Sequence, residues 1–185
     1  MPRDDWLVGG DRRAIAAERI YAAATDLIAR KGLDAFDIDT LAARVHCSRA
    51  TIYRYAGGKP EIRDAVLTRA ANRIIDAVRA DVEKLSGPDR VVTAIILALK
   101  RIRSDPLGQL MIGSIRVTDE ISWLTESPLL AGFATDLAGL TDGDPRAAQW
   151  LVRVVLSLLY WPTEDPDAER ELVQRFVAPA FTGRS

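Results

Sequence analysis

The chain contains few of the residues on which metal and redox chemistry depends. Its 185 residues include one cysteine, Cys47, and one histidine, His46. A single cysteine excludes an intrachain disulfide and any zinc site built from several cysteines. Neighbouring residues do not face each other on a helix, so these two are a poor nucleophilic pair. There is no glycine-rich phosphate loop and no metal-ligand spacing, and we predict a protein that is not an enzyme and has no cofactor.

Long apolar runs are also missing. No stretch reaches the roughly 20 residues that span a bilayer, and the N-terminal segment MPRDDWLVGGDRR has no apolar signal core. We therefore expect a cytoplasmic protein without membrane contact. The formal net charge of -1 disfavours a protein that coats nucleic acid indiscriminately. Basic residues nevertheless outnumber acidic ones slightly over residues 1–70, and the balance reverses over residues 71–185.

Helical periodicity is present almost throughout the chain. Apolar residues recur every three to four positions in segments separated by Gly or Pro, and strand patterns are nearly absent. We predict an all-α protein of about nine helices. One expected helix is short and carries the apolar positions Ile38, Leu41, Ala42 and Val45. The others cover residues 12–31, 49–55, 60–85, 89–103, 106–112, 128–140, 146–161 and 166–181, and residues 113–127 remain ambiguous.

Residues 36–62, FDIDTLAARVHCSRATIYRYAGGKPEI, are the most informative segment. Asp37 or Asp39 can cap a first short helix, and Ser48 can cap a second. On the second helix Ala50 and Tyr53 share one face, while Arg49, Thr51, Arg54 and Tyr55 can point outward. No Asp or Glu lies between Thr40 and Pro60, a window that contains Arg44, Arg49, Arg54 and Lys59. Two short helices with a positive surface are typical of a helix-turn-helix that binds DNA through phosphate and base contacts.

This segment resembles the tetracycline-repressor (TetR) family of bacterial transcription regulators. The resemblance rests on an ordered set of residues: Arg30-Lys31-Gly32, Phe36, Leu41-Ala42, Ser48, Thr51-Ile52-Tyr53, Tyr55, Lys59 and Ile62. It implies that Arg49, Thr51 and Arg54 approach base edges or nearby phosphates. It also implies that a second group of residues holds the DNA backbone: Ser48, Tyr53, Tyr55 and Lys59. Arg44 adds positive charge and is a further candidate DNA contact.

Three positions depart from the family pattern. His46 stands where the turn usually has Gly, and Ala56 stands where an aromatic residue usually follows the recognition helix. Pro60 stands where an acidic residue usually opens the next helix. Proline is acceptable there, because a first-turn residue has no intrahelical partner for its amide. At His46, a positive φ would strain a residue other than glycine.

The resemblance divides the chain into a DNA-binding domain, residues 1–58, and a helical domain for effector binding and dimerisation, residues 59–185. The segment 146–161 is apolar nearly all round and must be buried on more than one side. It is either central to its own core or shared with a second subunit, and the family's four-helix dimer interface favours sharing. The predicted dimer residues are Val155, Leu158, Leu159, Leu172, Arg175, Phe176 and Pro179.

A small-molecule pocket in the second domain is a further implication of the resemblance. The candidate lining residues are Leu99, Ile102, Leu107, Met111, Ile115, Trp123, Phe133, Leu137, Trp150 and Val154. Their apolar character favours a small hydrophobic effector, although the same residues can equally form ordinary core.

Together these features predict a homodimeric, sequence-specific transcriptional regulator. The resemblance suggests a repressor that is released from a pseudo-palindromic double-stranded DNA operator by its ligand. The alternative is a helical adaptor that uses the helix-turn-helix for protein contacts. Salt separates the two, because binding through several phosphates weakens steeply with salt and an apolar protein contact does not.

Overall fold

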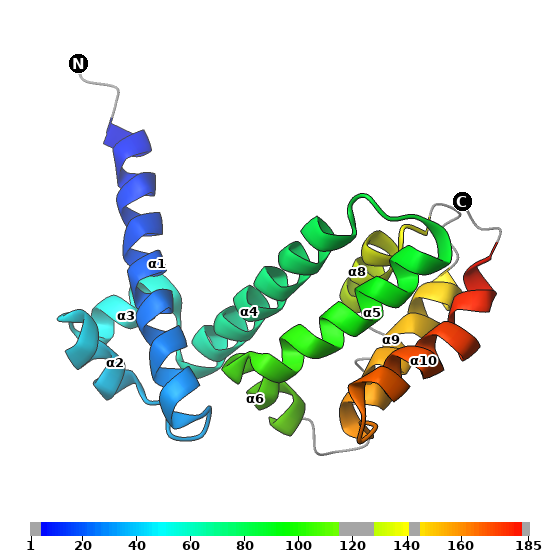
Figure 1. Cartoon of the computed structure of the whole chain (residues 1–185). Coiled ribbons are helices and arrows are strands. Elements are labelled where there is room, and N and C mark those ends of the chain that lie inside the picture. Colours follow the sequence, from blue (N-terminus) through cyan, green and yellow to red (C-terminus); the bar gives the residue numbers. More distant parts are fainter. Residues whose placement is uncertain (1–4, 115–127, 141–144, 183–185) are drawn as a thin grey trace. The chain divides into compact units, whose positions relative to one another are not determined.

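The computed structural model describes residues 5–114, 128–140 and 145–182, and within these ranges it contains nine α-helices and no strand. This confirms the all-α prediction. The elements are α1 (Asp5–Lys31), α2 (Ile38–Val45), α3 (Arg49–Ala56), α4 (Lys59–Val82), α5 (Gly87–Ser104), α6 (Pro106–Ser114), α8 (Pro128–Ala138), α9 (Pro145–Tyr160), α10 (Pro166–Phe176) and the short 3₁₀ helix η1 (Ala178–Phe181) (Figure 1).

The predicted helices differ from the observed ones mainly at their ends. The first helix begins at Asp5 instead of residue 12. The last predicted helix, 166–181, is α10 followed by η1, because Pro179 has no amide hydrogen with which to continue an α-helix. Of the ambiguous segment, residues 113 and 114 belong to α6, and residues 115–127 lie outside the described ranges.

The chain divides into two compact units, residues 1–70 and 71–185. The division falls within α4, whereas the sequence places the domain boundary at the start of that helix, between residues 58 and 59. In the first unit α1 packs against α2 and α3. The buried side chains of this unit include Ile20, Ala24, Leu27, Ile28, Phe36, Leu41, Ile52, Ile62 and Val66.

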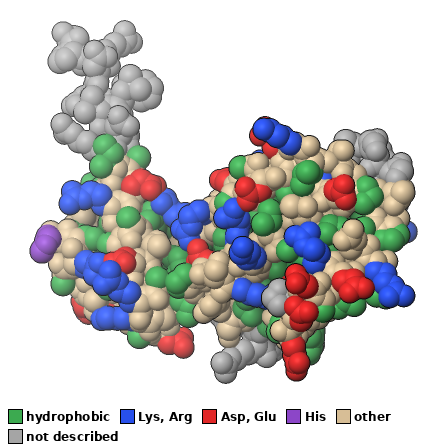
Figure 2. All heavy atoms as spheres, viewed as in Figure 1, with side chains coloured by type: hydrophobic (Ala, Val, Ile, Leu, Met, Phe, Trp, Pro, Cys, Tyr) green, Lys and Arg blue, Asp and Glu red, His purple; other side chains and the backbone are tan. Residues whose placement is uncertain are grey.

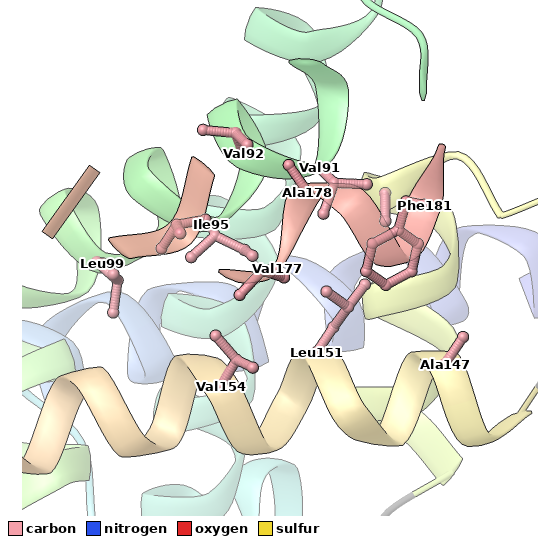
Figure 3. Close-up of a cluster of buried hydrophobic side chains, with 12 residues drawn as sticks. Val91, Val92, Ile95, Leu99, Ala147, Leu151, Val154, Val177, Ala178 and Phe181 are labelled. Atoms are coloured by element: carbon pink, nitrogen blue, oxygen red, sulfur yellow. The ribbon is translucent and has the colours of Figure 1, made fainter. Parts of the chain in front are cut away.

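In the second unit α5 is the central helix, with α6, α8, α9, α10 and η1 packed around it. Figure 3 shows the main core, in which side chains of α5, α9 and the C-terminal segment converge. A smaller cluster joins the second half of α4 to α5 through Ile74, Val78, Val82 and Ala94. Of the helices in the described ranges, none is both long enough and apolar enough to cross a membrane.

Candidate functional site

Local hydrogen bonds fix where the two short helices of the N-terminal unit begin. Asp37 caps α2: its carboxylate accepts from the Thr40 backbone N–H and from the Thr40 hydroxyl, each at 2.7 Å. These two hydrogen bonds lower the pKa of Asp37. Ser48 caps α3 and accepts from the Thr51 N–H at 3.2 Å. The predicted Ser48 cap is confirmed. Of the two candidates for the cap of α2, Asp37 and Asp39, the cap is Asp37.

The turn between α2 and α3 depends on a left-handed residue. His46 has φ 54° and ψ 47°, and among the described residues it alone has a positive φ without being glycine. Its conformation allows the Cys47 N–H to return to the Ala42 carbonyl at 3.1 Å. The turn therefore requires a positive φ at position 46, the condition under which the sequence predicts strain, and a histidine adopts it.

The buried face of α3 is formed by Ile52 and Ala56. Ala50 is exposed and Tyr53 is 57% exposed, so the face that these two share points to solvent. The reason is spacing: Ile52 and Ala56 lie four residues apart and meet the core together. Exposed side chains of α3 also include Arg49 and Arg54, whereas Thr51 and Tyr55 are half-buried. The hydroxyl oxygens of Thr51 and Ser48 are 2.9 Å apart.

Positive side chains gather on this unit (Figure 2), but carboxylates lie beside two of them. Arg44 pairs with Asp26 of α1, and Arg49 pairs with Asp39 through two hydrogen bonds. The sequence between Thr40 and Pro60 contains no acidic residue, but the surface it forms does have acidic neighbours. Asp26 of α1 and Asp39 in the first turn of α2 lie against its arginines. Lys59 donates to the Asp34 carbonyl at 3.1 Å. Arg54 has no ion-pair partner in the part of the chain that the structure describes.

Helix α1 supports the end of α3 through contacts that sequence reasoning missed. The Tyr21 hydroxyl donates to the Ala56 carbonyl at 3.4 Å, and Arg13 donates to the Arg54 carbonyl at 3.5 Å. Arg69 of α4 lies over the Tyr21 ring, 4.4 Å from its centroid, and forms two hydrogen bonds with Glu18. Helical spacing identifies these residues as surface positions but gives no sign of their partners.

The second unit contains an apolar cavity of about 220 Å³. Five helices line it, including α4 through Ala71, Ile74 and Ile75. Tyr160 also lines it, and its hydroxyl donates to the carbonyl of Ile112, another lining residue, at 3.1 Å. The remaining lining residues are Val91, Ala94, Ile95, Ala98, Ile102, Gly108, Met111, Leu130, Phe133, Ala134, Leu137, Ala138, Leu151, Val152, Val155, Leu156 and Leu159.

The structure brings together only some of the predicted pocket residues. Ile102, Met111, Phe133 and Leu137 line the cavity. Other predicted lining residues do not: Leu99 and Leu107 are buried away from it, and Trp150 and Val154 lie on the other side of α9. Ile115 and Trp123 are outside the described residues.

A groove on the outer side of α9 and α10 contains two of the predicted residues that do not line the cavity, Trp150 and Val154. It is lined by Trp150, Arg153, Val154, Ser157, Leu158, Leu172, Val173, Phe176 and Val177.

Three predicted dimer residues, Leu158, Leu172 and Phe176, therefore lie together in the groove. Arg175 lies over the Phe176 ring, 5.4 Å from its centroid, and Pro179 is exposed on η1. Val155 and Leu159 face the cavity instead, because α9 turns them about 100° per residue away from the groove.

The geometry of α2, the His46 turn and α3 is that of a helix-turn-helix, the class of DNA-binding unit whose second helix enters the major groove. The sequence profile of the bacterial regulatory proteins of the tetR family matches residues 20–66, the segment that holds this unit. An uncharacterized HTH-type transcriptional regulator of Mycobacterium tuberculosis, Rv1255c, is 29% identical over 191 residues, which cover 100% of this chain and 94% of the relative.

Two solved structures have the same fold. The TetR family repressor AlkX from Dietzia sp. superposes with a TM-score of 0.60 at 19% identity, covering 89% of this chain and 94% of its own. A TetR/AcrR family regulator from Thermobifida fusca also gives 0.60, at 18% identity, with 90% and 98% covered. The chain thus contains a DNA-binding segment of the kind found in the tetR family of bacterial regulatory proteins, and it has the fold of two TetR family regulators.

Proposed function

We propose that this regulator is a homodimeric repressor that leaves its operator when a small apolar molecule enters the cavity of the second unit. The observation that carries the proposal is the position of α4. Its residues Ala71, Ile74 and Ile75 form part of the cavity wall, and the same helix begins in the unit that holds α3. A ligand that favours one position of α4 therefore changes DNA affinity through a two-site coupling.

The ligand class follows from the cavity wall. Aliphatic and aromatic side chains supply almost all of it, and the Tyr160 hydroxyl is already bonded to the Ile112 carbonyl. A sugar or phosphate would give up its hydrogen bonds to water there without replacing them, whereas an alkyl chain has no hydrogen bonds to give up. The TetR family repressor AlkX, a structural relative, is implicated in biodegradation of n-alkanes. We propose a small alkane-like or long-chain alcohol effector.

On the DNA side, the roles proposed for the residues of α2, α3 and the start of α4 follow their exposure and position. Arg49 and Arg54, exposed on α3, reach base edges or the phosphates beside them, and Thr51 contributes at the same end of the helix. Ser48, Tyr53, Tyr55 and Lys59 hold the phosphate backbone, with Arg44 adding charge. Residues 1–58 are the proposed DNA-binding domain and residues 59–185 the effector and dimerisation domain, in a protein that works in the cytoplasm.

A ligand titration tests the proposal. The complex of the protein with an operator selected from random DNA is titrated with n-alkyl alcohols of increasing length, and fluorescence anisotropy of the DNA is recorded. We expect the longer alcohols to weaken operator binding by about 5- to 150-fold, the usual range of coupling between two sites. No change at any chain length would contradict the proposed effector class.

Ala98 offers a matched pair of variants for that titration. Ala98→Phe places a ring into the cavity, which Ala98 lines, while Ala80→Phe adds the same ring on an exposed position of α4. Ala98→Phe should bind the operator yet no longer respond to the alcohols, and Ala80→Phe should respond as the unaltered protein does. An equal response of both variants would place the alcohol outside the cavity.

A further inference from the structure

We propose that Asp39 is a positioning residue for base recognition. By binding the Nε–Nη2 edge of the Arg49 guanidinium, it presents the Nη1–Nη2 end to a guanine in the major groove. This inference rests on the proposed role of Arg49 as a base contact, and it adds a residue of α2 that does not itself touch DNA to the determinants of specificity.

The hydrogen bonds between the two side chains leave the reading edge of Arg49 free. Nε of Arg49 donates to Oδ1 of Asp39, and Nη2 donates to Oδ2. A guanidinium has five N–H groups, and this arrangement uses only two of them. The Nη1 group and the second hydrogen of Nη2 remain, and they form the end-on fork that fits O6 and N7 of guanine. One arginine can therefore bind Asp39 and guanine at the same time.

The backbone on both sides of this ion pair is fixed. Asp39 lies in the first turn of α2, which Asp37 caps, and Arg49 opens α3, which Ser48 caps. The side chains of Arg49 and Asp39 are 62% and 61% exposed, so DNA can reach the free edge. An ion pair this exposed adds little to folding stability. Its effect is on the orientation of a long side chain, which bound DNA would otherwise have to order.

The other arginines of α2 and α3 are not held in this way. Arg44 reaches Asp26 through one nitrogen, and the other oxygen of that carboxylate faces Arg30 at 3.2 Å. Arg54 has no carboxylate partner among the described residues. Within the described part of the chain, Arg49 is thus the arginine of α2 and α3 whose guanidinium plane is fixed by two parallel hydrogen bonds. A fixed plane is what a bidentate contact with a base requires.

A set of matched variants tests the proposal. Asp39→Asn removes one negative charge and one of the two acceptors, and Asp26→Asn removes the same charge from the Arg44 pair. Each variant competes for the selected operator against operators with single base changes. Arg49→Ala should lose about 5- to 150-fold of the preference for one G·C pair, the discrimination that a bidentate base contact provides.

Asp39→Asn should lose at least about threefold of the preference at that same pair, and Asp26→Asn should keep it. The double variant Asp39→Asn with Arg49→Ala should match Arg49→Ala alone, because the carboxylate acts through the arginine. Thermal unfolding of each variant confirms that it folds. Asp39→Ser, which suits a first helical turn, repeats the test if the asparagine variant unfolds.

Two results overturn the proposal, and they differ. If Arg49→Ala loses the preference and Asp39→Asn and Asp39→Ser both keep it, Arg49 reads the base without Asp39. If Arg49→Ala itself keeps every base preference, the proposed role of Arg49 as a base contact fails, and the inference about Asp39 fails with it.

Discussion

Glu169 of α10 accepts two hydrogen bonds from Arg103 of α5, each 2.8 Å long, although only 4% of Glu169 is exposed. Nη2 of Arg103 also donates to the Leu158 carbonyl of α9 at 2.7 Å. The pair therefore joins the three helices that carry the main core and the outer groove. A buried carboxylate is costly unless it is paired, so the two residues depend on each other.

Glu169→Ala should destabilise the protein by about 2 to 3 kcal/mol, below the usual cost of breaking a buried pair because Arg103 keeps a third of its side chain in solvent. Glu171→Ala, two residues along the same helix and exposed, should change the free energy of unfolding by less than about 0.5 kcal/mol. Urea denaturation measures both. Equal values would mean that the Arg103 pair contributes nothing to stability.

His46→Gly should raise the free energy of unfolding by up to about 1 kcal/mol, because glycine adopts the left-handed conformation of the turn without the Cβ clash. His46→Val should lower it, since a β-branched residue is strained most at a positive φ. His46→Asn, a residue that tolerates this conformation, is the neutral comparison. Thermal unfolding of the three variants gives the order, and a stabilising valine would contradict the turn described here.

Gly108→Ala should disturb α6, which forms one wall of the cavity. A Cβ atom at this position would lie 2.4 Å from the Ile102 carbonyl oxygen, which belongs to the backbone and has little room to move. We expect a loss of about 1 to 3 kcal/mol from overpacking. A Cβ atom at Gly113 on the same helix meets no described residue within 4 Å, so Gly113→Ala should gain up to about 1 kcal/mol from helix propensity. Chemical denaturation distinguishes them, and a Gly108→Ala protein as stable as Gly113→Ala would contradict the close approach.

Trp150→Asp should convert the proposed dimer into a monomer, because Trp150 is 48% exposed in the α9–α10 groove and the change replaces its apolar surface by a charge that an interface would desolvate. Operator affinity should fall by about 100-fold or more as the second half-site is lost. Trp161→Asp is the control: Trp161 is 74% exposed and outside the groove residues. Sedimentation gives the masses, and a dimeric Trp150→Asp protein would show that the subunits meet elsewhere.

Much of the fold is predictable from the sequence because helix signals are local. Proline at first turns, Ser48 and Asp37 as caps, and apolar spacing indicated nearly every helix, and errors were confined to helix ends. The HTH segment was recognisable for the same reason: its residues are close in sequence, and their order carries the information.

The relations between helices were harder to predict. The apolar character of residues 146–161 indicated burial on two sides, but it did not show which residues belong to which side. Trp150 was therefore expected in the pocket and lies in the groove, while Val155 and Leu159 were expected at the dimer interface and line the cavity. The contact between Asp39 and Arg49 could not be predicted either. It depends on how α2 and α3 pack together, which the order of charges along the chain does not show.

Selection of bound sequences from a random double-stranded DNA library at moderate salt, with the solution mass of the protein measured alongside, tests the central claim most directly. We predict an enriched inverted repeat whose half-sites are roughly one helical turn, about 34 to 36 Å, apart, bound by a dimer and weakened steeply by salt. A folded dimer that enriches no sequence would contradict this account and favour a helical adaptor that uses α2 and α3 to bind protein.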